Sequence, residues 1–557
     1  MGLTSNAQRI NISRVGKIAP GGVTLKSGPG SFFALLQLAL LLLGATPLAA
    51  DEFRSPAVSV VRVDWRAAFD QLRAEIGAQP SVATAFTFVG RSRLAAADPR
   101  SMPALVQLNA TTSQIFTGIG RSPVPVLLPF DAAGYLEARW AGTPESLTLP
   151  RFQADFRVAD LFDAGPAGYD AVFSLAPGTG SGLPQRIFAK PVEVQITGSL
   201  LTYDLNDPLG GKGEPVKSLA AQFPDLRRFI REGYVRYAFT RFGVPYVVSI
   251  QCLDSAPRPR RLACREAYPV AERFLKALRV AGGLPSRPRA DIASEAVERP
   301  AVASADFTYR PPGDLIVRSG SRKQSGRIDY TAYSQIRFPL QKTPAFAHSQ
   351  SFGLRKNDKL DEFGPASYPW QDNFCEARSF GVGQCPSGFG HQGQDMRPAP
   401  CPAHDEGMEH CDPKQQVVVA ARDAMLIREP KQQAATLQIN TRNEHIRFRY
   451  MHMDPKAMDA DGVLNGRHVE EGEKIGVVSN YLDRPNGTTR HLHFDVQVFT
   501  RDGWLWVNPY VTLISAYERL IRGRGREIGP HVGPAADMAH ALPEDMTRRE
   551  VEEGAEN

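Results

Sequence analysis

The run of residues 491–498 constrains the fold of this 557-residue chain more than any other stretch, and it reads His-Leu-His-Phe-Asp-Val-Gln-Val. Its side chains alternate in character, as they do in a β-strand with two different faces. Residues i and i+2 of a strand project to the same side, so His491 and His493 would enter one pocket. The chain contains 11 histidines, and such a close pair is therefore unusual. The run predicts a strand that carries functional imidazoles.

A second cluster combines an imidazole with a carboxylate four residues later, in the sequence Gly390-His391-Gln392-Gly393-Gln394-Asp395. His391 and Asp395 are an even number of residues apart, and Gly393 would let the backbone lie close to whatever they bind. By itself this spacing most often belongs to two ordinary surface residues. Joined by a histidine of the 491–493 pair, however, it makes a set of two imidazoles and one carboxylate. Such a set suits catalytic zinc, which keeps a fourth position for water.

A third signal lies between these clusters, in Arg449-Tyr450-Met451-His452-Met453-Asp454-Pro455. It supplies His452, which together with His491 makes a further pair of histidines. Such a pair near a metal ion would be available for proton transfer and for stabilising charge. The full order is His-x-Gly-x-Asp, then Tyr-x-His, then a Gly-rich approach, then His-x-His-Phe-Asp.

That order resembles the lysostaphin-type (LytM-like) zinc endopeptidases, which cleave peptide cross-links in bacterial cell walls. The resemblance covers about residues 335–515 and nothing outside them. Four further segments share it: Phe338-Pro339-Leu340, Ser349-Gln350-Ser351-Phe352-Gly353-Leu354-Arg355, Val469 to Val478, and Trp506-Val507-Asn508-Pro509-Tyr510. Carried over position by position, the resemblance implies that His391, Asp395 and His493 bind one zinc ion. It implies that His452 and His491 form the catalytic pair.

Three features depart from the family pattern. Arg490 stands where the family usually has a proline before His-x-His, and Asp495 replaces a common glutamate. After Asp395 comes an insertion that carries Cys401, His404, His410 and Cys411. We expect these changes to affect the fit of the substrate more than the binding of the metal.

The six cysteines fall into three short-range pairs, which are 252–264, 375–385 and 401–411. Six cysteines allow 15 pairings, so spacing alone does not prove the connectivity. Nearest-neighbour disulfides are the simplest prediction for a chain that folds in an oxidising compartment. A rival interpretation of the insertion is a structural metal site, made from Cys401, His404, His410 and Cys411.

The first 50 residues predict export. Basic residues (Arg9, Arg14, Lys17 and Lys26) precede an apolar run, 32–44, which is followed by Thr46-Pro47-Leu48-Ala49-Ala50. The apolar run is shorter than the ~20 residues of a membrane-spanning helix, and this order of segments is typical of a secretory signal peptide. We expect cleavage after Ala50 and a periplasmic or cell-envelope location. If the segment stays uncleaved, we expect it to associate the protein with the inner membrane.

The remaining chain predicts an α+β protein in several parts. We expect an N-terminal mixed α+β domain of unrecognised family over 51–283 and a linker rich in Pro, Ala, Ser and charge over 284–305. We then expect a peptidase domain of mainly antiparallel β-sheet over 306–515, and a C-terminal helix with a charged tail over 516–557. In the first domain, Asp64 is expected to cap a helix that starts at Trp65, and residues 223–231 are expected to be helical.

No chemistry is predicted for the first domain, because the chain has no histidine before His348 and the acidic residues there show no paired spacing. The histidines outside the three clusters and the insertion are His348, His445, His468, His531 and His540, and we expect them to be surface or structural residues. The net charge of +6 is small for this length, so we expect no nucleic-acid partner.

The function that we predict is that of a zinc metalloendopeptidase acting on peptidoglycan stem peptides. One alternative is a non-enzymatic or latent wall protein that regulates other hydrolases, as some members of the family do after losing zinc ligands. The complete His and Asp set of this chain speaks against that alternative. Another is a carboxypeptidase or a metal-dependent amidase with the same ligands, which only the reaction product would distinguish.

Overall fold

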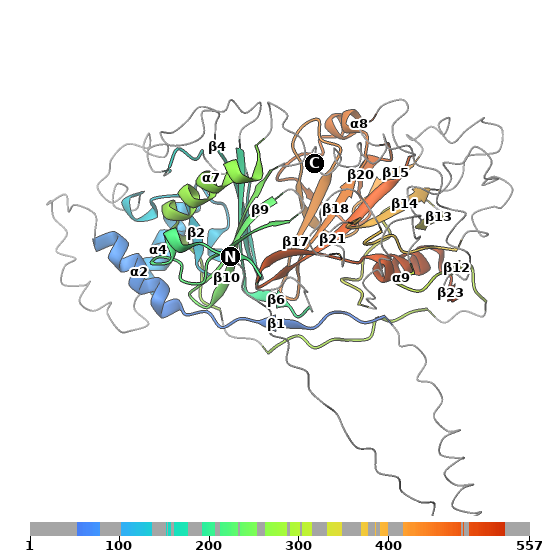
Figure 1. Ribbon diagram of the computed structural model, residues 1–557, viewed down its shortest axis with the longest axis horizontal. Coiled ribbons are helices and arrows are strands. Elements are labelled where there is room, and N and C mark those ends of the chain that lie inside the picture. The colour runs from blue at the N-terminus through green and yellow to red at the C-terminus, as the bar shows by residue number, and fades with distance from the viewer. Residues whose placement is uncertain are drawn as a thin grey trace, which may run out of the picture. The chain divides into compact units, whose positions relative to one another are not determined.

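The computed structural model divides the chain into two units, Met1–Asp51 and Glu52–Asn557, and all residues that it describes belong to the second (Figure 1). The predicted signal peptide therefore lies outside the described residues. The description covers residues 53–529 with gaps at 78–101, 136–151, 153, 158–160, 176–191, 206–211, 232–233, 253–261, 287–289, 301–303, 315–330, 343, 348–368, 377–384, 386–389, 399–415, 481–482 and 484–489.

A seven-stranded antiparallel sheet forms the centre of the N-terminal part, in the order β3-β4-β5-β10-β9-β8-β7. Its strands are β3 (Leu161–Gly165), β4 (Gly168–Leu175), β5 (Val192–Ser199), β7 (Glu214–Pro215), β8 (Arg227–Arg231), β9 (Tyr234–Arg241) and β10 (Val244–Gln251). The helical elements described here are α2 (Trp65–Gly77), α4 (Met102–Thr112), α7 (Cys264–Ala277) and the short 3-10 turns η3 (Ile119–Arg121) and η5 (Lys217–Leu219).

The hairpin between β9 and β10 shows how local sequence builds this sheet. Arg241 pairs with Val244, which leaves Phe242 and Gly243 as a two-residue turn. Both turn residues have positive φ, 55° and 75°, as a type I′ turn requires. This turn type matches the right-handed twist of the strands, so the two strands stay paired along their full length.

Local helix predictions succeeded in one place and failed in another. The Asp64 carboxylate accepts a hydrogen bond of 3.0 Å from the Ala67 backbone N–H at the start of α2, which confirms the predicted cap. The predicted helix over residues 223–231 is wrong, because Arg227–Arg231 forms β8 and pairs with β9. Backbone hydrogen bonds to a neighbouring strand outweigh the weak helical preference of such a short segment.

An eight-stranded sheet forms the centre of the C-terminal part, in the order β13-β14-β21-β18-β17-β16-β19, with β22 also pairing to β21. The strands are β13 (Ala345–Ala347), β14 (Gln394–Pro398), β16 (Ala424–Ile427), β17 (Ala435–Asn440), β18 (His445–Met451), β19 (His468–Val469), β21 (Leu492–Thr500) and β22 (Gly503–Val507). All nine residues of β21 are buried, since β14, β18 and β22 pair with it.

Smaller elements complete the fold. The two-stranded pairs are β1 (Val58–Val60) with β6 (Leu201–Tyr203), β2 (Val126–Leu128) with β11 (Arg279–Gly282), β15 (Val417–Val419) with β20 (Lys474–Val477), and β12 (Phe307–Tyr309) with β23 (Gly525–Glu527). Of these, β12 and β23 are parallel. The C-terminal part also contains α8 (Pro455–Ala460) and α9 (Tyr510–Ile521), which runs across position 515. Helices with mainly antiparallel strands agree with the expected α+β class.

The segment predicted as a linker is hydrogen-bonded to the beginning of the described chain. Val58 and Ile292 exchange both backbone hydrogen bonds, of 2.9 and 2.8 Å, and the Val297 N–H donates to the Phe53 carbonyl at 2.7 Å. Phe53, Val58 and Val297 are buried in the same core as the C-terminal sheet. Residues 292–297 are therefore hydrogen-bonded to the folded part of the chain, and Val297 is the buried residue among them.

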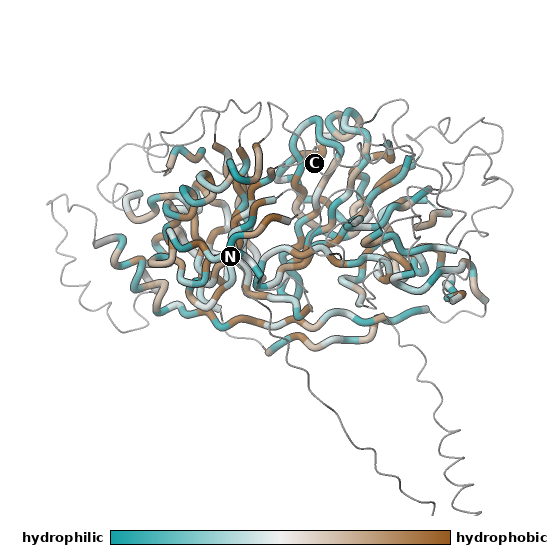
Figure 2. The backbone as a smooth tube through the Cα atoms, in the orientation of Figure 1, coloured by the Kyte–Doolittle hydropathy of each residue, from teal (hydrophilic) through white to brown (hydrophobic). Residues whose placement is uncertain are grey.

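Two large apolar cores underlie the two sheets. One contains the inward side chains of the N-terminal sheet with α7, and the other contains those of the C-terminal sheet with α9. Figure 2 shows hydrophobic stretches along the strands and hydrophilic stretches in α8 and in many turns.

A buried polar cluster joins the two sheets. Asp170 on β4 accepts a hydrogen bond of 2.8 Å from the Arg447 guanidinium on β18 and lies 2.8 Å from His445 Nε2. The other nitrogen of His445 is 2.8 Å from the Ser199 hydroxyl on β5. All four side chains are buried. His445 is therefore part of the buried contact between the two sheets.

Candidate metal centre

Asp395 and His493 face each other across neighbouring strands. Asp395 lies on β14 and His493 lies on β21, and the antiparallel register places them directly opposite. Directly opposed residues of an antiparallel pair point to the same face with their Cβ atoms about 5 Å apart. The register therefore brings a carboxylate and an imidazole together, although 98 positions separate them in the sequence.

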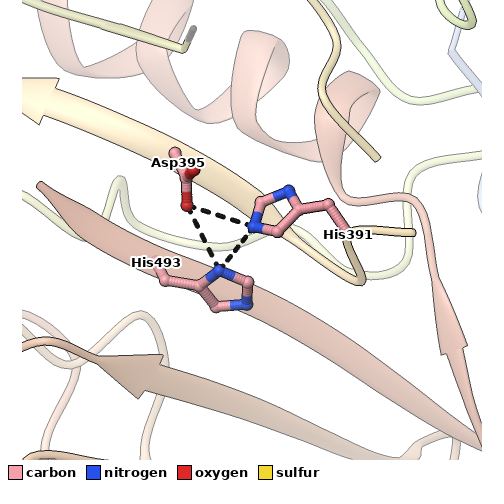
Figure 3. Close-up of side chains that lie close together, drawn as sticks. All are labelled: His391, Asp395 and His493. Carbon is pink, nitrogen blue, oxygen red and sulfur yellow. Dashed lines mark hydrogen bonds and ion pairs between the residues drawn. The ribbon is translucent and has the colours of Figure 1, made fainter. Parts of the chain in front are cut away.

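His391 completes a triangle of possible ligand atoms, as Figure 3 shows. His391 Nε2 is 2.8 Å from His493 Nδ1 and 3.1 Å from Asp395 Oδ1. The third side of the triangle, from His493 Nδ1 to Asp395 Oδ1, measures 3.2 Å. All three residues are buried, with at most 4% of their surface exposed. The structure thus brings together the three residues that the sequence predicted as metal ligands.

His391 is oriented by contacts with residues 373–376. Its Nδ1 lies 3.0 Å from the Asn373 carbonyl oxygen, which can only accept a hydrogen bond. Nδ1 must therefore carry the proton, and Nε2 offers its lone pair to the triangle. The backbone of His391 is bonded on both sides, to the Glu376 carbonyl at 2.9 Å and to the Cys375 N–H at 2.6 Å. A disulfide between Cys375 and Cys385 closes this segment.

A buried carboxylate that the sequence analysis missed supports this segment. Asp372 accepts hydrogen bonds from Gln394 at 2.5 Å, from Asn508 at 2.6 Å and from the Phe374 N–H at 2.9 Å. Burial raises the pKa of Asp372, and these hydrogen bonds oppose that shift. Its neighbour Asn373 accepts a bond of 3.1 Å from the Asp395 N–H. The polar run just before Cys375 was the only sequence signal for this network.

Gly393 is required by close packing. A Cβ atom there would lie 2.6 Å from the Phe494 carbonyl oxygen and 2.7 Å from His493 Nε2. Any larger residue would displace the His493 ring or push β21 away. Gly393 thus allows the loop after His391 to approach β21.

His452 and His491 lie beside the triangle. His491 directly precedes β21, and its Nε2 is 3.5 Å from Asp395 Oδ1. His452 follows β18, and its ring centroid is 4.7 Å from that of His491 and 6.1 Å from that of His493. His452 has a φ of 64°, and its carbonyl accepts a 2.7 Å bond from the Ser479 N–H, which holds this uncommon backbone conformation. All five predicted site residues therefore share one region.

The electrostatics of the site favour an ionised carboxylate. Burial alone would raise the pKa of Asp395, but the charges of His391 and His491 and hydrogen bonds from His391 and His493 hold that pKa well below its usual range. Burial alone would lower the pKa of His493, yet hydrogen bonds to Asp395 and Asp495 raise it above the ordinary value. Asp395 and His493 thus stabilise each other's charged forms.

The donor atoms suit a small divalent ion. Tetrahedral zinc with ligand distances of about 2.0–2.2 Å needs neighbouring ligand atoms about 3.3 Å apart. The observed separations of 2.8, 3.1 and 3.2 Å need only a slight expansion. Two imidazole nitrogens and one carboxylate oxygen are also ligand types that zinc accepts. The group could therefore hold a metal ion.

Several sequence predictions concern residues that the structure does not describe. These are the 401–411 cysteine pair with His404 and His410, the 349–355 segment, and His348, His531 and His540. Of the remaining histidines, His445 is buried in the cluster with Asp170, and His468 on β19 is exposed.

Two of the predicted disulfides are confirmed, Cys252–Cys264 and Cys375–Cys385. Disulfides persist in oxidising compartments, so they indicate an extracytoplasmic protein. Among the described residues, no helix has the length and apolar character needed to cross a membrane.

Comparisons with known proteins found likenesses among solved structures. No protein-family model and no curated protein matches the chain. One solved structure is described as a putative glycyl-glycine endopeptidase lytM from Ruminococcus gnavus. The match covers 34% of the present chain and 62% of the length of that structure's chain. The identity is 16% and the TM-score is 0.19.

Proposed function

We propose that this protein is a zinc metalloendopeptidase that hydrolyses peptide cross-links of peptidoglycan in the periplasm or cell envelope. The observation that carries the proposal is the buried triangle of His391, Asp395 and His493 with two further histidines beside it. The substrate class follows from the sequence resemblance of residues 335–515 to the lysostaphin-type enzymes. The two disulfides support an extracytoplasmic site of action.

The three ligands would hold zinc through His391 Nε2, Asp395 Oδ1 and His493 Nδ1. When bound, zinc supplies Lewis-acid polarisation of a carbonyl group and makes water more acidic. Asn373 contributes by fixing the tautomer of His391, because its carbonyl oxygen accepts the Nδ1 proton at 3.0 Å.

His452 and His491 would act as general base and general acid. Neutral imidazole can accept a proton from water as the carbonyl is attacked, and imidazolium can return it to the departing amine. An imidazole N–H aimed at the carbonyl oxygen would also stabilise the negative charge that develops there. Their ring separation of 4.7 Å lets both reach one reacting group. Their burial keeps bulk water from competing for those hydrogen bonds.

The test combines zinc content with digestion of purified cell-wall sacculi. Wild type would be measured beside His391→Ala and beside His468→Ala, a histidine on β19 that is exposed and outside the site. We expect about one zinc ion per chain and release of cleaved stem peptides for wild type and His468→Ala. Both properties should be lost in His391→Ala.

The alternative functions give different results. A zinc-loaded wild type that releases no peptide from sacculi would contradict the enzymatic proposal. Wild type without zinc would favour the regulatory alternative. Mass analysis of released peptides would separate an endopeptidase from a carboxypeptidase or an amidase, since each leaves different termini.

A further inference from the structure

The second nitrogen of His493 points away from the donor triangle and toward another carboxylate. Nδ1 faces His391 and Asp395, and Nε2 lies 3.5 Å from Asp495 Oδ2. A histidine that binds metal through one nitrogen carries its proton on the other, where a carboxylate can hold the ring in place. Asp495 is two residues beyond His493 on β21, so both side chains share one face of the strand.

Asp495 is a fully buried carboxylate with a defined set of partners. Arg449 is directly opposite on β18, and its Nε donates a hydrogen bond of 2.6 Å to the same oxygen that faces His493. Gln497 donates a longer bond of 3.4 Å to the other oxygen. A buried carboxylate keeps its charge and its position only with such partners. The position of Asp495 therefore depends on Arg449.

Arg449 is in turn supported by the Trp506 ring on β22 and, through that ring, by the N-terminal sheet. Its guanidinium lies 5.6 Å from the Trp506 ring centroid. Arg236, on β9, lies 4.7 Å from the same ring and donates a hydrogen bond to the Trp504 carbonyl. Only 2% of Arg236 is exposed. A cavity of about 50 Å³, lined by Arg236, Arg449 and Trp506 among others, marks this contact between the sheets.

We propose that Asp495 is the positioning residue for the zinc ligand His493, and that Arg449 and Arg236 hold it in place. The chain of contacts runs Arg236, Trp506, Arg449, Asp495, His493. It assigns the N-terminal sheet a part in building the metal site. The inference rests on the proposed zinc function, because it concerns the affinity of the site for that metal.

A simpler account is that Arg449 and Asp495 only hold β18 to β21. The two accounts differ in what a substitution changes. A purely structural ion pair would affect the stability of the fold and leave the zinc affinity of the folded protein unchanged. A positioning residue changes the zinc affinity itself, since a misoriented imidazole binds less well.

The experiment measures zinc dissociation constants by chelator competition at pH 7 on the full chain, with unfolding curves of the zinc-free proteins. The variants are Asp495→Asn, Arg449→Met and Arg236→Met. The matched control is Glu444→Gln, which breaks a contact of 3.1 Å between Arg422 and Glu444 away from the site. We expect Asp495→Asn to weaken zinc binding by about 10–100-fold. Arg449→Met should weaken zinc binding by a smaller factor, and Arg236→Met by a still smaller one. Glu444→Gln should have no effect.

The outcomes separate this inference from the proposed function. Zinc affinity unchanged by Asp495→Asn, in a wild type that binds zinc, overturns the positioning role and leaves the proposed function intact. Unchanged affinity in Arg236→Met alone overturns the part assigned to the N-terminal sheet. Wild type that binds no zinc overturns both proposals. If Asp495→Asn fails to fold, the ring ¹⁵N shift of His493 Nε2 in zinc-loaded wild type gives the same decision. A shift typical of an N–H that donates to a carboxylate is expected, and the shift of an N–H without such an acceptor overturns the positioning role.

Discussion

Asp395 and His493 occupy directly opposite positions on β14 and β21, and their ligand atoms lie 3.2 Å apart. The register of one strand pair therefore places two of the three candidate ligands at once. A slip of one residue between the two strands would place these two side chains on opposite faces of the sheet. His391 reaches the same point from the loop before β14, whose approach depends on Gly393.

Removal of His493 is expected to abolish zinc binding. The variant His493→Ala leaves one imidazole and one carboxylate, which is too few ligands for tight zinc binding. Metal analysis of the purified protein should show about one zinc ion in wild type and almost none in the variant. His468→Ala is the control and should keep its zinc. A His493→Ala protein with full zinc content would show that the metal lies elsewhere.

Removal of His452 is expected to separate catalysis from metal binding. Its ring centroid is 6.1 Å from that of His493, and its side chain is not part of the donor triangle. His452→Ala should keep its zinc and lose about 10²–10⁴-fold in turnover, because general acid–base catalysis contributes that much. Turnover of a defined cross-linked peptide, measured beside zinc content, checks this. Loss of both properties would argue that His452 supports the ligands.

The two described disulfides are expected to differ in their effect on the metal site. Cys375–Cys385 closes the segment whose carbonyl groups orient His391, whereas Cys252–Cys264 lies at the start of α7. The double variant Cys375→Ser with Cys385→Ser should weaken zinc binding by about 10–100-fold, as loss of supporting contacts usually does. The matched pair Cys252→Ser with Cys264→Ser should lose stability but keep its zinc affinity. Equal affinities for the two double variants would contradict a role for the 375–385 disulfide.

Zinc binding and the stability of the zinc-free protein should respond to pH with opposite signs. The pKa of His493 is raised, because hydrogen bonds to Asp395 and Asp495 outweigh the effect of burial. A proton on His493 competes with zinc, so zinc affinity should fall as the pH drops through the raised pKa of His493. Without zinc, the protonated ring stabilises the fold below the unfolded-state pKa of about 6.5, and this contribution is lost as the pH rises through the folded-state pKa. Chelator competition and urea unfolding between pH 5.5 and 8.5 check the two trends. Parallel trends would contradict this assignment.

The buried cluster around Asp170 is expected to stabilise the contact between the two sheets. Burial alone would raise the pKa of Asp170, but the charges of His445 and Arg447 lower it. A carboxyl with a lowered pKa contributes stability above its unfolded-state value of about 3.9, and that contribution is lost as the pH falls toward the folded-state value. Asp170→Asn should therefore cost about 3–5 kcal/mol at pH 7, because it leaves Arg447 buried without its charge partner.

Urea unfolding at pH 7 and at pH 3.5 measures this effect. The difference between wild type and Asp170→Asn should shrink at the lower pH, because the Asp170 carboxyl of the unfolded chain protonates there and part of the wild-type stabilisation is lost. Asp163→Asn is a suitable control, since Asp163 lies on the neighbouring strand β3 and burial raises the pKa of its carboxyl. A difference that grows at low pH would contradict the assigned sign.

Local sequence was sufficient for features that depend on neighbouring residues. The alternation over 491–498 predicted β21, Asp64 predicted the cap of α2, and short spacing predicted two disulfides. Local sequence failed over residues 223–231, where pairing with β9 decided the conformation. It also missed Asp372 and Asn373, whose partners Gln394 and Asn508 are distant along the chain.

The sequence by itself determined which side chains are available and how they alternate, because strand periodicity and turn preferences act over a few residues. The tertiary structure decided which of them meet. His445 lies 275 positions from Asp170, and His493 lies 98 positions from Asp395. Such contacts depend on strand register and on packing between sheets, where burying a charge demands a partner from wherever the fold can supply one. That requirement places Arg449 against Asp495, and Asp495 against His493.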